Sequence, residues 1–472
     1  ILKLRSSPHS SLLPYSIAYP FLIELGKLYA CESLESWLIE TLRPHAELAD
    51  QLGVLSLISP LDLPGKEEAQ HTSPESKSLA INSLFKALLV HASKEFKMCC
   101  VVEDLQWFDN SSVHLVTECL LKTPQIPCIY TIRTSESNTK TKQLLGQLKS
   151  AQARISEFDL RPFSWAETEQ FVLNWFSVAE VPKPLVDALH QLSAGNLLLI
   201  SSLVQSLQQD GTIRKLVLGG IQVDFKKLEQ FSSLPINMEH ALQARMDTLP
   251  KSHRIVLSHC SIFKTAFSAS EVQDAFHYAD RRWLDQVFME LENQKFVRSF
   301  MSNSGQIRLI FEHQVIEQCV YERIPFEERK ALHAKFAQWL ENQMTDTGLD
   351  DRNRLTIRLA AQYDWAGMLD KALPLTQNAI RFAFEVGALD DALERLDKLI
   401  EWNQSGVLGK LSNLDLAHLH EKKAQVYYSQ GRLMDATHHY VLSLSTLGVK
   451  LDANAPLLKL RNYLTLQTIY LR

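Results

Sequence analysis

Glycine is scarce in this sequence, with 16 glycines among 472 residues, roughly half of the usual share. A turn-rich, all-β protein needs more glycine than this, so the shortage favours long helices joined by few tight turns. No apolar run reaches the ~18 residues that a membrane-spanning helix requires. The net charge of −5 excludes a global attraction to nucleic acid or to anionic membranes.

Cysteine pairs at metal-binding spacing are also missing. The 7 cysteines are spread along the chain and none forms a Cys-x-x-Cys pair, so a zinc site is not expected. Their odd number and apolar neighbours predict buried free thiols in a reducing cytoplasm. Residues 1–5 contain neither an initiator methionine nor a signal peptide, and the sequence stops within a helical pattern. We therefore expect a piece of a longer protein.

Four segments between residues 77 and 133 predict a parallel β-α-β unit. Apolar residues recur at helical spacing in 77–96, and the continuous apolar run 98–102 is typical of a strand that is buried on both faces. Residues 110–112 (Asn-Ser-Ser) have the composition of a helix N-cap, and 128–133 is a second buried strand. Strand, helix and strand in this order form a β-α-β unit.

The middle of the chain has mainly helical periodicity. Helices are predicted over residues 164–210, 238–260, 268–278, 280–294, 313–324 and 326–343. The first begins with a capping box from Ser164 to Glu167. A β-hairpin whose turn is Ser302 to Gly305 follows the helix at 280–294. Three helices followed by a hairpin make a winged helix.

The pattern from residue 355 onward is helical throughout. Three segments have a glycine followed five residues later by an alanine and then a helix, at Gly367/Ala372, Gly387/Ala392 and Gly431/Ala436. Glycine fits a helix–helix turn, and alanine fits a place where two helices pack closely. This is the pattern of tetratricopeptides, although the offsets of 20 and 44 residues differ from their regular 34. Irregularly stacked helical hairpins are expected.

The segment from Val101 to Asp109 carries the strongest chemical signal. Its adjacent carboxylates, Glu103 and Asp104, follow a buried parallel strand, and open α/β sheets bind ligands beyond the carboxyl ends of such strands. One carboxylate can hold Mg²⁺ directly or through water, and the other can polarise the water that attacks a γ-phosphate. For this pair alone, a solvated strand end with incidental acids is the alternative.

With the residues that follow, the sequence resembles the AAA-like signal-transduction NTPases of the STAND group. In that family the Walker B strand consists of aliphatic residues, an acidic pair, Leu, His or Gln, Trp, any residue and Asp, which Val101 to Asp109 matches. Similar segments follow the family's order along the chain. They are Ser6 to Leu25, Ile129 to Arg133, Phe158 to Phe163, Ser193 to Leu197, Leu234 to Leu249 and Phe311 to His333.

The resemblance implies a mixed, mostly α fold in four parts. An incomplete α/β parallel-sheet NTPase core would occupy residues 1–157, and a helical lid residues 158–235. A winged helix with connecting helices would follow at 236–345, and a truncated solenoid of tetratricopeptide-like helices at 346–472.

The resemblance also implies roles for individual residues. Glu103 and Asp104 would be the catalytic pair and would bind Mg²⁺. Arg133 would sense the γ-phosphate of ATP, although an ion pair with a nearby acid is an equal alternative. Gly195 and Asn196 would contact the base side of the nucleotide. Trp107 is expected to be a core anchor below the Walker B loop.

Two departures from the family pattern affect these expectations. The phosphate-binding loop, G-x4-G-K-[ST], does not occur in the 472 residues, so triphosphate binding by them should be weak. We expect the loop to lie upstream of Ile1. Leu197 also replaces the proline of the family's Gly-Asn-Pro element, which affects the expected base contact and not the fold.

The expected function is that of a regulatory ATPase and protein-interaction segment in a larger cytoplasmic signalling protein. Its relatives would include the ATPase–repeat region of soluble adenylyl cyclases, so a class III cyclase is the expected output domain in the same chain. The repeats would bind protein partners. DNA binding by the helix at 280–294 is not expected, because its side chains carry a net charge of −2. The alternatives are an inactive tetratricopeptide scaffold, or the ATPase region of a LuxR-type regulator or a Ser/Thr kinase fusion.

Overall fold

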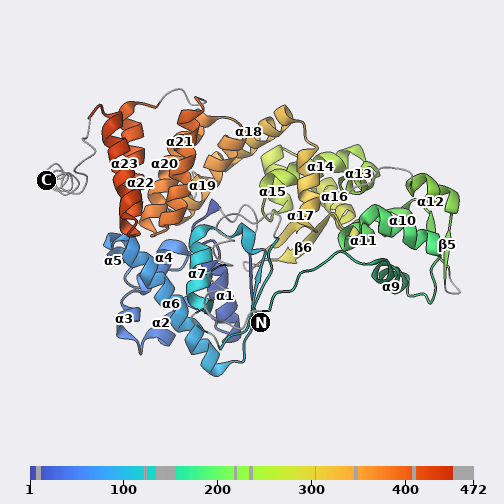
Figure 1. The fold of residues 1–472 in the computed structure, drawn as a ribbon, viewed down its shortest axis with the longest axis horizontal. Helices are drawn as coiled ribbons and strands as arrows, with labels where there is room; N and C mark the ends of the chain where they lie inside the picture. The colour runs from blue at the N-terminus through green and yellow to red at the C-terminus, as the bar shows by residue number, and fades with distance from the viewer. Residues whose placement is uncertain are drawn as a thin grey trace. The chain divides into compact units, whose positions relative to one another are not determined.

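The computed structural model describes most of the chain. The described residues are 1–6, 12–121, 123, 125–133, 146, 156–216, 220–232, 238–302, 305–344, 349–406 and 411–449. The chain divides into two compact units (Figure 1). The first unit comprises residues 1–155 and 333–472, and the second unit comprises residues 156–332.

A three-stranded parallel sheet lies in the N-terminal part of the first unit. Its strands are β1 (Leu2–Arg5), β2 (Cys100–Glu103) and β3 (Cys128–Tyr130), in the order β1-β2-β3. The central strand β2 places Cys100 opposite both Leu2 and Cys128. This confirms the predicted β-α-β unit. The predicted burial of its strands on both faces is wrong, because Val101 is only half-buried and Ile129 is 55% exposed. β1 is an additional strand, in which Leu2 and Leu4 are buried and the residues between and after them are exposed.

Helices pack against the buried face of this sheet and share one apolar core with it (Figure 1). They are α1 (Ala18–Leu28), α2 (Leu34–Leu42), α3 (Ala46–Ala49), α4 (Leu55–Ile58), α5 (Lys66–His71), α6 (Pro74–Glu95) and α7 (Asn110–Leu121). The rings of Phe21 and Phe85 lie 5.4 Å apart between α1 and α6. α6 begins three residues before its predicted start, because Ser73 caps it and Pro74 fits its first turn.

The C-terminal part of the first unit consists of antiparallel helices. The helices from residue 326 onward are α18 (Phe326–Gln343), α19 (Leu349–Trp365), α20 (Leu369–Glu385), α21 (Leu389–Gln404), α22 (Asn413–Ser429) and α23 (Leu433–Thr446). The glycines 367, 387 and 431 all have positive φ angles at the turns. The alanines 372, 392 and 436 are fully buried, which confirms the predicted helical hairpins.

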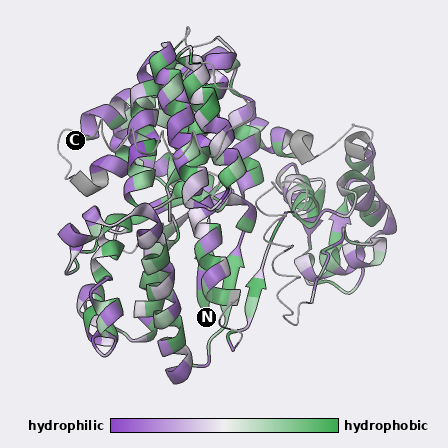
Figure 2. Ribbon diagram, turned by 60° about the vertical axis from the view of Figure 1, so that its left-hand side comes forward, coloured by the Kyte–Doolittle hydropathy of each residue, from purple (hydrophilic) through white to green (hydrophobic). Residues whose placement is uncertain are grey.

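The hairpin of α20 and α21 belongs to the same core as the sheet. Ala383, Val386, Ala388 and Ala392 are buried in the cluster that also contains the strand residues. At Gly387 a Cβ atom would lie only 2.4 Å from the carbonyl oxygen of Pro74, so the turn approaches the start of α6 closely. Figure 2 shows the strands of the sheet as largely apolar, whereas the helices alternate apolar and polar faces.

The second unit contains the following elements. They are α9 (Trp165–Phe176), α10 (Lys183–Ser193), α11 (Leu197–Gln209), β4 (Ile213–Lys215), β5 (Ile221–Val223), α12 (Phe225–Ser232), α13 (Met238–Asp247), α14 (Lys251–Phe263), α15 (Ala269–Phe276), α16 (Arg281–Asn293), β6 (Val297–Met301), β7 (Ile307–Phe311) and α17 (Gln314–Glu322). The predicted capping box of Ser164 and Glu167 is present. The hairpin of β6 and β7 follows α14, α15 and α16 as predicted, and Phe267 pairs with Leu309 beside it.

Several predicted boundaries in the second unit are wrong. The helix expected at 238–260 is two helices, because Pro250 cannot continue a helix and instead caps α14. The helical stretch expected at 164–210 consists of three helices. The β4–β5 hairpin follows them, and the apolar periodicity of the sequence did not predict it. Parts of three motifs, at residues 7–11, 234–237 and 303–304, lie outside the described residues.

The fold is therefore mixed and mostly α, with an N-terminal parallel sheet and C-terminal helical hairpins, as predicted. All seven cysteines are free thiols. Four of them are buried and three are half-buried, so the prediction of buried thiols is only partly correct. Among the described helices, none is both long and apolar enough to cross a membrane.

Candidate functional site

The predicted acidic pair lies at the carboxyl end of the central strand. Glu103 is the last residue of β2, and Asp104 follows it with φ 57° and ψ 48°, in the left-handed region. Asp tolerates this conformation better than most residues, and it turns the chain out of the sheet. Thr131, just after β3, holds the turn: its hydroxyl accepts from the Asp104 backbone N–H at 3.0 Å, and its carbonyl accepts from the Leu105 N–H at 3.1 Å.

A cation from the neighbouring strand lies close to both carboxylates. The Nε of Arg5, the last residue of β1, is 3.8 Å from Glu103 Oε2 and 3.8 Å from Asp104 Oδ2. The parallel register pairs Arg5 with Glu103, so the two strand ends meet at one edge of the sheet. Sequence reasoning missed Arg5, although the alternation of leucine with basic residues in 2–5 indicates a short strand. Because the Arg5 side chain is 56% exposed, these pairs contribute little to stability.

Arg133 reaches the same edge through a polar link. The buried Gln106 donates from Nε2 to Asp104 Oδ1 at 3.3 Å, and its Oε1 accepts from the Arg133 backbone N–H at 3.1 Å. The Arg133 guanidinium lies 5.0 Å from the centre of the Trp107 ring. The structure therefore brings the backbone of Arg133 to the same edge as Glu103 and Asp104, with its guanidinium over Trp107. Trp107 is only half-buried and contacts this cation, so the predicted role of core anchor does not fit it.

Leu105 and Phe108 fill the core position that was expected for Trp107. Both are almost fully buried, with exposures of 1% and 2%, and both belong to the central apolar cluster. Leu105 begins the short 3₁₀ turn that ends at Trp107, and Phe108 directly follows it. The loop after β2 is therefore anchored by these two apolar side chains and leaves the acids facing the edge of the sheet.

The last acid of the motif, Asp109, has a structural role. Its carboxylate is 2% exposed and accepts hydrogen bonds from the backbone N–H groups of Tyr15, Ser16 and Ser112 and from both serine hydroxyls. Burial raises the pKa of this carboxyl, and the donors oppose that effect. Asp109 is the residue that caps α7, so the predicted N-cap at Asn110 to Ser112 is wrong by one residue.

A second buried acid reaches the start of α7 from the repeats. Asp391 in α21 is 2% exposed and accepts from the Asn110 N–H at 3.0 Å, the Ser111 N–H at 3.1 Å and the Ser111 hydroxyl at 2.5 Å. Arg395 donates to the Asp391 carbonyl at 2.8 Å and also bonds the Leu12 carbonyl. Sequence reasoning missed Asp391, because no local signal identifies a partner 280 residues away.

Gly195 and Asn196 lie in the second unit, at the turn between α10 and α11. The Gly195 carbonyl accepts from the Phe163 N–H at 2.8 Å, and a Cβ atom here would lie 2.2 Å from the Phe163 carbonyl oxygen. Asn196 caps α11 through its side chain, which accepts from the Leu199 N–H at 3.2 Å. These contacts account for both residues without a ligand, and the base contact stays a prediction.

The sheet edge offers oxygen ligands to a hard cation. The carboxylates of Glu103 and Asp104 are partly exposed, at 37% and 20%, and carboxylate oxygens are what Mg²⁺ prefers. Among the described residues, no group of three His, Cys, Asp or Glu side chains can hold a metal. A cation bound here would therefore complete its shell with water or phosphate oxygens, as Mg²⁺ commonly does. The two carboxylates therefore fit Mg²⁺ as two of its oxygen ligands.

Comparison with known proteins finds distant likenesses among solved structures. No protein-family model and no curated protein matches the chain. A solved structure of a STAND protein with a tetratricopeptide repeat sensor from Pyrococcus horikoshii is similar over 78% of this chain, with 10% identity and a TM-score of 0.35. The chain spans 53% of the length of that protein. Similarity at this level does not establish a shared fold, so the function is argued from the residues of this chain.

Proposed function

We propose that the chain is the regulatory, ATP-binding and protein-interaction segment of a larger cytoplasmic signalling protein. The observation that carries the proposal is the edge of the sheet where Glu103, Asp104 and Arg133 meet. Ligand sites in open parallel sheets lie beyond the carboxyl ends of the strands. A pair of carboxylates and a cation at that edge match the charges of a magnesium-bound triphosphate.

Each residue would have a distinct part in binding and hydrolysis. Glu103 and Asp104 would hold Mg²⁺, and one of them would orient and polarise the attacking water. The cation would neutralise phosphate charge when bound. Arg133 would exchange its contact with Trp107 for the γ-phosphate, and Arg5 would balance the two carboxylates in the absence of nucleotide. Gly195 and Asn196 would lie on the base side.

The link from the acidic loop to the repeats supports a regulatory role. The loop that follows Glu103 ends at the start of α7, and Asp391 of α21 accepts hydrogen bonds from the first residues of α7. A change in the loop on nucleotide turnover would therefore act directly on the α20–α21 hairpin. We propose that the repeats bind a protein partner and that the output domain in the same chain is a class III nucleotide cyclase.

The module of α14 to α16 with the β6–β7 hairpin would be a winged helix that acts as a switch element. Its third helix, α16, contains an ion pair between Arg281 and Asp285 at 2.9 Å, and Glu290 lies 2.8 Å from His253. These contacts pair three of its charged side chains within the unit. With a net charge of −2 on residues 280–294, which comprise this helix and the residues that flank it, we expect no salt-sensitive gel shift with random duplex DNA, and a strong shift would contradict this part of the proposal.

The test of the ATPase proposal uses the longest chain that the gene encodes around these 472 residues. Asp104→Asn should lower ATP hydrolysis about tenfold or more with the fold intact. Asp62→Asn, at an exposed acid of the same unit, is the matched control and should leave turnover unchanged. Full activity of the Asp104→Asn chain would refute the assigned role.

Two further results would separate the ATPase from an inactive scaffold. A G-x4-G-K-[ST] loop within about 40 residues before Ile1 supports the ATPase, and its absence there favours the scaffold. The 472-residue chain by itself should bind ATP weakly, because it contains no such loop. A micromolar dissociation constant by calorimetry would contradict that expectation.

A further inference from the structure

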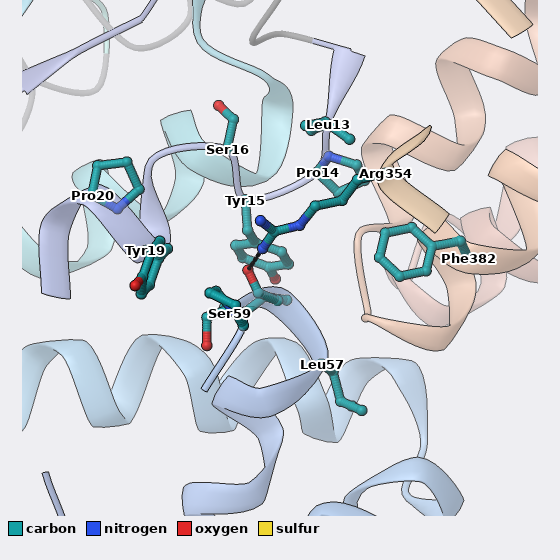
Figure 3. A pocket seen from close by; sticks show the side chains of 12 residues that line it. Leu13, Pro14, Tyr15, Ser16, Tyr19, Pro20, Leu57, Ser59, Arg354 and Phe382 are labelled. Atoms are coloured by element: carbon teal, nitrogen blue, oxygen red, sulfur yellow. Dashed lines mark hydrogen bonds between the residues drawn. The ribbon is translucent and has the colours of Figure 1, made fainter. Parts of the chain in front are cut away.

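A pocket lies within the first unit, away from the acidic edge. Its volume is about 210 Å³. One wall comes from the loop before α1 and from the start of α1, a second from the end of α4, and a third from α19 and α20 of the repeats (Figure 3). Pro14, Pro20, Leu57 and Phe382 supply apolar surface. A ligand in this pocket would touch both the sheet domain and the repeats.

The charge in the pocket comes from Arg354 of α19. Among the described residues that line the pocket, Arg354 is the charged one, and no described carboxylate pairs with it. It donates from Nη2 to the Ile58 carbonyl at 3.3 Å, which holds the side chain in place (Figure 3). A guanidinium carries five N–H donors, so most of them stay available to a ligand. The planar donor pair of arginine matches a carboxylate.

Most hydroxyl groups that line the pocket already donate a hydrogen bond within the protein. Tyr15 donates to Ser78 Oγ at 3.3 Å, Ser16 to Asp109 at 2.7 Å, and Ser59 to the Leu55 carbonyl at 2.6 Å. Burial raises the pKa of Tyr15, so its hydroxyl stays neutral. The Tyr19 hydroxyl has no hydrogen bond with a described residue. Arg354 and Tyr19 are therefore the lining donors that stay available to a ligand.

Nearby negative charge does not cancel the positive charge of Arg354. Asp391 and Asp109 are carboxylates whose charges act on Tyr15 and raise its pKa. The structure gives Asp109 five hydrogen-bond donors and Asp391 three. Their charges are therefore already compensated within the fold, whereas the partner of Arg354 among the described residues is a neutral carbonyl.

We propose that this pocket binds a small organic carboxylate, with the carboxylate on Arg354 and Tyr19 and the hydrocarbon part against the proline, leucine and phenylalanine side chains. A cavity of about 150 Å³ accommodates benzene, so a pocket of this volume fits a ligand with one aromatic ring or a short branched chain. The ligand would bridge the sheet domain and the repeats. Binding of the carboxylate in this pocket does not depend on nucleotide binding at the strand edge.

The test is a ligand-observed ¹⁹F NMR titration of the 472-residue chain with 4-fluorobenzoate. We expect saturable binding in the millimolar range or tighter. The neutral isostere 4-fluorobenzamide should bind at least tenfold more weakly, because it loses the charge-assisted hydrogen bonds to Arg354. Absence of saturable binding, or equal binding of the amide, overturns the proposal. Binding of inorganic phosphate without binding of fluorobenzoate overturns it as well.

Matched variants assign the binding to this pocket. Arg354→Gln should weaken fluorobenzoate binding about tenfold or more. Arg352→Gln makes the same change two residues earlier on α19, at an exposed position outside the pocket, and should leave binding within twofold. Unchanged binding to a folded Arg354→Gln chain overturns the proposal. If circular dichroism shows that Arg354→Gln does not fold, Tyr19→Phe decides: about threefold weaker binding supports the proposal, and unchanged binding overturns it.

Discussion

The acids at the strand edge, Glu103 and Asp104, are held much more loosely than the acids at the start of α7, Asp109 and Asp391. At the edge, Arg5 lies 3.8 Å from each carboxylate, and Gln106 donates one hydrogen bond to Asp104. At α7, Asp109 accepts five hydrogen bonds and Asp391 accepts three, and each is only 2% exposed. The first pair keeps carboxylate oxygens available to a ligand, whereas the carboxylate oxygens of the second pair accept hydrogen bonds from the surrounding fold.

This difference shows that proximity in the sequence does not define the role of an acid. Asp104 and Asp109 are five residues apart in one motif, yet one faces the sheet edge and the other lies among backbone donors. A buried charge with all of its partners stabilises the particular arrangement around it, and loss of that charge leaves several donors unsatisfied. Substitutions should therefore affect stability strongly at one pair and function at the other.

Asp109→Ala should have the largest effect on stability. It removes the acceptor of five buried donors in the loop before α1 and in α7, and we expect a loss of about 3–5 kcal/mol in the free energy of unfolding. Urea denaturation followed by circular dichroism measures the loss. Asp109→Asn keeps one acceptor oxygen and should cost less. A loss below about 1 kcal/mol for the alanine variant would remove the contrast between the two pairs.

Asp391→Ala should have the next largest effect, about 2–3 kcal/mol, since it leaves the Asn110 and Ser111 donors of α7 without their acceptor. Limited proteolysis should show earlier cleavage near the α20–α21 hairpin. Asp390→Ala, at the neighbouring acid of the same helix turn, is the control. Equal effects of the two substitutions would show that Asp391 has no special role.

Gly387→Ala should cost about 2 kcal/mol. The residue has φ 74°, and a Cβ atom would lie 2.4 Å from the Pro74 carbonyl oxygen, so the backbone must shift. Gly431→Ala provides the control, since it has the same φ but no atom within 4 Å of the added Cβ. It should cost about 1 kcal/mol from backbone strain alone. Thermal unfolding of the two variants compares them, and identical losses would contradict the close packing at Gly387.

Asp104→Asn should have the smallest effect on stability, within about 0.5 kcal/mol, because its carboxylate has weak partners and is partly exposed. Urea denaturation beside Asp109→Ala gives the comparison directly. A destabilisation as large as that of Asp109→Ala would mean that the edge acids belong to the structural network. The loss of ATP hydrolysis expected for the longer chain is then the measurement that separates function from folding.

Local patterns predicted the elements that depend on nearby residues. The apolar run before Glu103 indicated the central strand, and the glycine–alanine spacing indicated the hairpins of the repeats. The capping box at Ser164 is also local, since its two hydrogen bonds join residues three positions apart. The helix expected at 238–260 failed because the apolar periodicity continued across Pro250, where the backbone cannot.

The candidate site was only partly predictable. Its acids and Arg133 follow two adjacent parallel strands, and the carboxyl ends of parallel strands meet at one edge, so their proximity follows from the pattern. Arg5 was missed because a strand of four residues gives a weak signal. Asp391 and Arg354 were missed because their partners lie 280 and 296 residues away along the chain.

The sequence by itself therefore determined the mixed, mostly α character, the central acid-tipped strand and the helical hairpins near the C-terminus. These depend on periodicity, caps and turn residues within about ten positions. Only the tertiary structure decided which acids are buried and which face the sheet edge, that α21 caps α7, and that Arg354 lines a pocket with the loop before α1. Burial and hydrogen-bond partners depend on packing between distant segments, which no local pattern encodes.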